Sequence, residues 1–113
     1  MSRQMDSVPV TFATNTSASP PFTLAPYSGA IVLVGTTWNT AMIGFSLSAN
    51  EAGTYVNVVD NSLRVVGIPA QPSMAIPIPY DVSSTARWVR LVSHSLGNLI
   101  AQTAPTVTVL RKE

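Results

Sequence analysis

Hydrophobic residues in this chain occur in short runs separated by turn residues, and none keeps the helical period of 3.6 over ten residues or more. Residues 42–48 and 86–93 alternate apolar and polar positions, as half-buried strands do. Turn signals recur roughly every 8–12 residues, which is typical of a sandwich or barrel. We therefore predict an all-β fold, a single antiparallel β-sandwich or jelly-roll-like barrel of about eight short strands.

Individual segments predict more specific features. Residues 30–34 are continuously apolar and predict a strand buried on both faces. Residues 67–73 contain two prolines and predict a loop, whereas 74–80 alternate apolar residues with proline and predict an edge strand or a polyproline-like segment. The remaining predictions are a strand at 54–59 paired with 42–48 across a turn at 49–53, a turn at 60–62, a strand at 63–66, one helical turn at 81–84 capped by Asp81, a turn at 94–98 and a strand at 106–110.

The N-terminal segment divides the chain into two parts. Val8 to Phe12 alternates like an edge strand, with Pro9 removing one hydrogen-bond donor, and residues 15–21 are rich in Ser, Thr and Pro. We predict an N-terminal arm and first strand over 1–25, and a β-sandwich domain over 26–113. An ordinary first strand followed by a long loop is the alternative.

The low content of charged residues suggests that this protein binds other proteins. The 113 residues are 46% hydrophobic and only 10% charged, with a net charge of +1; a typical domain is nearer ~25% charged. So few charges indicate that other protein covers part of the surface. The charge balance gives no footprint for nucleic acid, and no apolar run approaches the ~20 residues that span a bilayer. A polar start without the apolar region of a secretory signal leads us to expect a product that stays in the cytoplasm after synthesis.

Candidate chemistry is sparse. The chain has no cysteine and a single histidine, His94, which we expect in a surface turn. Ser93 and Ser95 flank it, but adjacent strand residues point to opposite faces, so neither is placed for a catalytic triad. The acidic residues fall at the chain ends or in predicted turns, and no nucleotide or metal motif occurs. We therefore expect no catalytic residue, no metal, no cofactor and no enzymatic activity.

Four aromatic residues leave two interpretations open. Trp38, Tyr55, Tyr80 and Trp88 are either core or subunit-interface anchors, or flat exposed rings on which a sugar stacks. The first interpretation predicts buried rings and the second predicts exposed ones.

The order of segments over residues 30 to 110 resembles a class of small virion proteins of tailed bacteriophages. The resemblance is carried by Trp38, Met42–Ser48, Gly53–Asp60, Met74–Tyr80, Ala86–Ser93 and Gln102–Leu110. The first turn departs from that pattern, because Asn50-Glu51-Ala52-Gly53 stands where the class has Asp-Gly. The strand pair and the Ala86-Arg87-Trp88-Val89-Arg90-Leu91 strand are also similar to galactose-binding-type jelly rolls.

The first resemblance implies a structural virion protein of the head decoration, or cement, type. It would bind the major capsid protein lattice on the capsid surface as a homo-oligomer, with a trimer favoured, and stabilise the shell. The second implies the alternative, a carbohydrate-binding jelly-roll module of a phage tail or fibre assembly. The interface residues we expect are Val8, Val10, Phe12, Pro69, Pro72 and Met74.

Overall fold

The computed structural model describes residues 5–24, 29–59, 66–79, 88–96, 98–103 and 106–112, and within these it contains twelve strands and no helix. The strands are β1 Met5–Thr11, β2 Thr14–Thr16, β3 Phe22–Thr23, β4 Gly29–Leu33, β5 Ala41–Ser48, β6 Val56–Asn57, β7 Ile68–Ala70, β8 Ala75–Pro77, β9 Trp88–Ser95, β10 Asn98–Leu99, β11 Gln102–Thr103 and β12 Thr106–Lys112. The predicted all-β class is confirmed.

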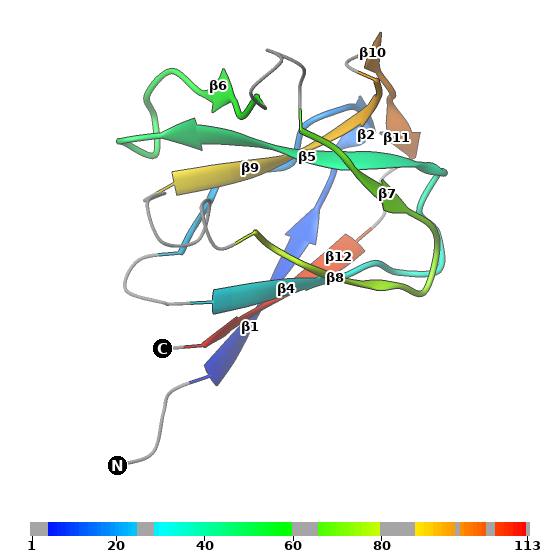
Figure 1. Ribbon diagram of the computed structural model, residues 1–113, viewed down its shortest axis with the longest axis horizontal. Helices are drawn as coiled ribbons and strands as arrows, with labels where there is room; N and C mark the ends of the chain where they lie inside the picture. Colours follow the sequence, from blue (N-terminus) through cyan, green and yellow to red (C-terminus); the bar gives the residue numbers. More distant parts are fainter. Residues whose placement is uncertain are drawn as a thin grey trace.

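Two sheets pack face to face, as Figure 1 shows. One has four strands in the order β1-β12-β4-β8, and the other has the order β10-β9-β5-β6, with β3 added to β9 and β7 added to β5. A third, two-stranded sheet joins β11 to β2. All pairings among the described strands are antiparallel, so the predicted antiparallel sandwich is confirmed.

Alternation along each strand builds the core between the sheets. In the four-stranded sheet, Val8 lies opposite Val109, Val109 opposite Val32, and Val32 opposite Ile76. β-branched side chains of this kind pack well on a pleated surface. The six-stranded sheet contributes the fully buried Ile43, Phe45, Val89 and Leu91 from β5 and β9, at every second position as the predicted alternation of these segments requires.

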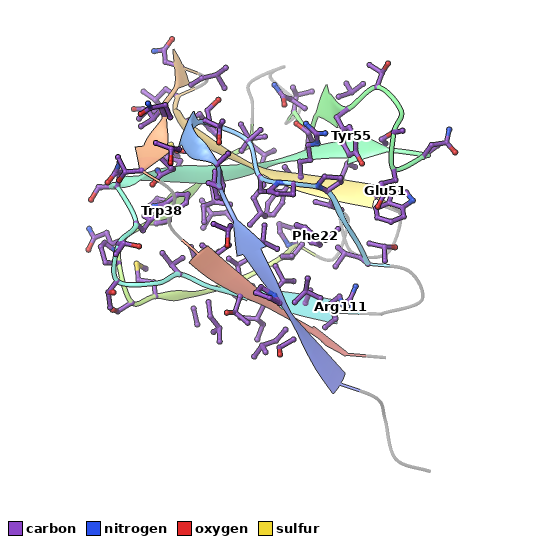
Figure 2. The ribbon with its side chains drawn as sticks, turned by 180° about the vertical axis from the view of Figure 1, so that it is seen from behind. Phe22, Trp38, Glu51, Tyr55 and Arg111 are labelled. Carbon is purple, nitrogen blue, oxygen red and sulfur yellow. The ribbon has the colours of Figure 1, made fainter. Side chains whose placement is uncertain are left out.

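Trp38 belongs to the core. Its side chain is 3% exposed, and its ring meets that of Phe12 edge to face with the ring centroids 5.4 Å apart. Figure 2 shows Trp38 and Phe22 lying between the two sheets. For this tryptophan the core interpretation is correct.

Strand β4 corrects one prediction. The strand exists, but it is not buried on both faces, because Ile31 is 40% exposed and Leu33 37% exposed while Val32 is fully buried. The core covers only the inner face of its sheet, and no part of the described chain covers the outer face.

The predicted loop at 67–73 is also partly wrong. Ile68–Ala70 forms β7, in which Pro69 pairs with Met42 of β5. Proline is tolerated there because β7 has no neighbour beyond β5 in the described sheets, so the missing N–H is not needed for a further ladder. The predicted edge strand at 74–80 is confirmed as β8, at the border of its sheet.

His94 is not in a surface turn. It lies in β9, which runs to Ser95, and its side chain is 1% exposed. Its Nε2 lies 3.1 Å from the carbonyl oxygen of Val66. The segment around Val66 and Gly67 covers the ring, and this segment is distant in the sequence.

The N-terminal segment takes part in the sandwich. Strand β1 pairs with β12 along its length at the border of the four-stranded sheet, as the edge-strand prediction requires. Further along, Ala18 pairs with Val92, and the hydroxyl of Ser19 accepts a hydrogen bond from the backbone N–H of Leu91. Residues 5–24 therefore contact both sheets.

The hairpin between β5 and β6 and the last strand β12 are also as predicted. The predicted turn at 60–62, the strand at 63–66 apart from Val66, the capped helical turn at 81–84 and the aromatic Tyr80 lie outside the described residues.

Candidate functional site

The outer face of the four-stranded sheet is the most distinctive surface of the molecule. Across it, Ser7 of β1 lies opposite Leu110 of β12, Leu110 opposite Ile31 of β4, and Ile31 opposite Pro77 of β8. In the next row, Pro9, Thr108, Leu33 and Ala75 follow one another in the same way. We call these eight residues the outer face.

The outer face carries no charged side chain and is largely apolar. Ile31, Leu33, Pro9, Ala75 and Pro77 are exposed, and Leu110 is half-buried. An antiparallel sheet with one face in water normally presents polar residues there. A contiguous exposed apolar patch is instead the mark of an interaction site.

The area of the outer face is comparable to that of the largest apolar patch on a typical monomer. Four strands spaced about 4.8 Å apart, each contributing roughly 3.4 Å per residue over a few residues, span on the order of 300 Å². That is within the range of the largest patch on a typical monomer, which is often functional. A complete interface is larger, so neighbouring loops must add to it.

The outer side of the six-stranded sheet is different, because it includes polar and charged side chains. The guanidinium carbon of Arg90 lies 4.6 Å from the centre of the Tyr55 ring, a cation–π arrangement. On the neighbouring strands the hydroxyl of Ser46 donates to the side-chain oxygen of Asn57. The Nε of Arg90 is buried without a hydrogen-bond partner.

A flat exposed ring for a sugar is not found among the described aromatic residues. Trp38 is in the core, Trp88 is half-buried, and the guanidinium of Arg90 covers the half-buried Tyr55. The described residues also contain no group of three or more His, Cys, Asp or Glu that could hold a metal ion.

The six predicted interface residues fall into two groups. Val10 and Phe12 are 4% and 0% exposed and point into the core with the half-buried Val8. In this fold their side chains contact the core of the same chain and are not available to a partner. Pro69, Pro72 and Met74 are exposed, on β7 and on the connection from β7 to β8. The structure does not bring the two groups together into one surface.

Sequence reasoning missed Ile31 and Leu33 as surface residues. An unbroken apolar run carries no alternation, so it does not reveal which face of the strand is covered. The low overall charge was the available signal that some apolar surface lies outside the core.

No helix in the described part of the chain combines the length and apolar character that crossing a membrane requires.

Comparison with known proteins gives a likeness in fold. No protein-family model and no curated protein matches the sequence. Among solved structures, the crystal structure of SPBc2 prophage-derived protein YomS is similar, with a TM-score of 0.59 over 97% of this chain and 96% of that one. The two sequences are 14% identical, so the likeness shows a shared fold.

Proposed function

We propose that this chain is a structural virion protein of a bacteriophage that decorates and stabilises the capsid by binding the lattice of the major capsid protein. It acts by binding and assembly, without catalysing a reaction. The observation that carries the proposal is the outer face, an apolar and uncharged sheet surface that the described chain leaves in water.

The structural likeness supports a phage context. The similar structure is described as prophage-derived, and it matches this chain over nearly the full length of both.

Physical chemistry explains how such a surface stabilises a shell. A protein that binds only the assembled lattice stabilises that state by mass action. An uncharged contact has no ion to desolvate, so more of the apolar burial is retained as binding free energy. Many copies on one shell add these small contributions over the whole particle.

The carbohydrate-binding alternative receives no support from the described residues. It requires an exposed aromatic ring, and Trp38, Trp88 and Tyr55 are buried, half-buried and covered respectively. The decoration function is therefore the one we propose, with the capsid surface as the location and copies of the same chain, three being favoured, as the second partner.

The first test asks whether the chain is part of a particle. Particles are induced from the strain that carries the gene, purified, and analysed by mass spectrometry and antibody labelling in the electron microscope. We expect the chain in regular stoichiometry on the head. A chain that is absent from particles, or that labels only the tail, would overturn the capsid proposal.

The second test asks whether the outer face makes the contact. Purified chain is added to particles made without it, and co-sedimentation is measured for the wild type and for Ile31→Thr/Leu33→Thr. We expect at least ten-fold weaker binding for the double variant. Val56→Thr, which changes an exposed aliphatic residue on β6, serves as the matched control and should bind like the wild type. Equal binding of all three proteins would exclude the outer face.

A further inference from the structure

A second apolar feature lies far from the outer face, at the connection between β9 and β10. Leu96 is 86% exposed, the highest value among the large hydrophobic residues described, and Leu99 is 66% exposed, a value that Val56 of β6 shares. Figure 1 shows β10 at the upper rim of the molecule, away from β1 and β12. We call these two residues the leucine turn.

The backbone of the leucine turn is also unusual. Leu96 has a φ of 50°, in the left-handed region that bulky side chains rarely adopt. Asparagine or glycine would occupy this position at lower cost, so a leucine that is both strained and exposed contributes nothing evident to the fold. Strain of this kind is concentrated at functional sites.

A hollow of about 210 Å³ lies beside the leucine turn. Met42, Pro69, Ala70 and Ile100 give it apolar walls, and Thr40 and Ser95 lie among its polar residues. None of its lining residues is charged. A cavity of about 150 Å³ holds a benzene molecule, so a hollow of this size accepts a branched aliphatic side chain.

The leucine turn and the hollow are neighbours on one surface. Ser95 and Ile100 line the hollow, and they directly flank the segment that carries Leu96 and Leu99. Each molecule thus presents a projecting apolar element and a matching apolar recess side by side.

We propose that the leucine turn of one copy inserts into the hollow of a second copy of this chain. The proposal rests on the proposed function only in taking self-association from it. Because the turn and the hollow are different surfaces, each copy both donates a turn and receives one. It does so either with a single partner in a reciprocal pair or with two neighbours in a closed ring.

Charge identifies the occupant as protein and favours another copy. Residues 91–110 contain no Asp, Glu, Lys or Arg, and neither does the lining of the hollow, so the two surfaces match in having no ion to desolvate. A lipid surface would call for Lys or Arg beside the leucines. The exposed Thr40, Gln71 and Asn98 supply the polar rim that surrounds the apolar centre of an interface.

The size of the chain sets the area that such a contact needs. A standard interface takes about 10% of a small protein's surface from each partner. The chain exposes 6448 Å², so roughly 650 Å² per copy is needed, centred on the turn and the hollow.

The test measures native mass by light scattering after size exclusion. We expect the wild type at a multiple of 12.0 kDa and Leu96→Asn/Leu99→Asn at 12.0 kDa. Asparagine is tolerated at a positive φ, so this variant keeps the turn conformation. Val56→Asn removes another exposed aliphatic side chain and should keep the wild-type mass.

A mixing experiment separates this contact from general loss of stability. Thr40→Phe fills the hollow from an exposed position and should also give 12.0 kDa alone. The double leucine variant retains an open hollow and Thr40→Phe retains the turn, so an equimolar mixture should form a one-to-one complex. Circular dichroism confirms that each variant is folded.

Three results would overturn the inference: a wild type that is monomeric at every concentration, variants that keep the wild-type mass, or a mixture that stays separate. The particle-binding assay is scored independently. If the wild type forms an oligomer that depends on the leucine turn but does not bind particles, the capsid function alone is refuted. If the wild type is monomeric but binds particles, the self-association inference alone is refuted.

Discussion

The imidazole of His94 fits the fold because two residues next to it have no side chain. A Cβ on Gly44 would lie 2.6 Å from the Val66 carbonyl oxygen and 2.8 Å from Nε2 of His94. A Cβ on Gly67 would lie 2.6 Å from the Cε1 atom of the same ring. Since a carbonyl oxygen only accepts hydrogen bonds, Nε2 carries the proton that it donates to Val66.

Gly44→Ala should therefore destabilise the protein. The added methyl group meets backbone on one side and a buried ring on the other, and overpacking of this kind costs about 1–3 kcal/mol. The free energy of unfolding, measured in urea, should fall by that amount. Gly29→Ala is the control, because a Cβ there meets no atom within 4 Å. If the two alanine variants were equally stable, the His94 ring would not need the space that Gly44 leaves.

Residue-scale burial of polar groups was beyond sequence reasoning. Gln102 is fully buried and its side chain bonds to both the N–H and the C=O of Asn39 and to the hydroxyl of Ser93. These partners lie up to 63 residues away, so no local sequence pattern indicates them. For His94, the residues that follow it suggested a turn, and the covering Val66 and Gly67 come from another part of the chain.

At the scale of elements, β4 shows what a hydrophobic run does and does not specify. The unbroken apolar run at 30–34 predicted a strand, and β4 covers 29–33. Which of them face the core depends on the layer packed against the sheet. The same strand therefore supplies the fully buried Val32 to the core and Ile31 and Leu33 to the candidate assembly surface.

Substitutions along β4 should separate these two roles. Ile31→Thr/Leu33→Thr places a β-branched residue at both exposed positions and should change the free energy of unfolding by less than about 1 kcal/mol. Val32→Ala leaves a cavity on the buried side and should cost about 2 kcal/mol. Urea unfolding of the isolated chain measures both values. A double threonine variant as unstable as Val32→Ala would mean that the chain itself covers the outer face.

At the scale of the whole molecule, the class of fold was predictable and the pairing of strands was not. Period-two patterning and regularly spaced turns indicate a sandwich. The ladder from Met5↔Lys112 to Thr11↔Thr106 joins the two ends of the chain, and local sequence carries no record of such a partner. Two-residue strands such as β6 and β10 are too short to show any period.

From this long-range pairing we expect the folded monomer to need β1. Removing residues 1–12 would delete β1, leave the ladder of β12 unpaired on that side, and take Val10 and Phe12 out of the core. Truncation of one buried phenylalanine costs about 3–5 kcal/mol, a large share of the roughly 5–15 kcal/mol by which a domain is stable. The ring of Trp38 would also lose its edge-to-face contact.

We therefore expect the chain without residues 1–12 to lose cooperative thermal unfolding and its near-ultraviolet circular dichroism, and the fluorescence of Trp38 to shift to longer wavelength. Phe12→Leu is the graded control, since it keeps β1 and most of the buried volume and should only lower the Tm. An arm that merely reaches a neighbour would behave differently: the shortened chain would unfold at the wild-type Tm and lose only its partner. That outcome would show that β1 is dispensable within its own sandwich and would return Val8, Val10 and Phe12 to the set of intermolecular contacts.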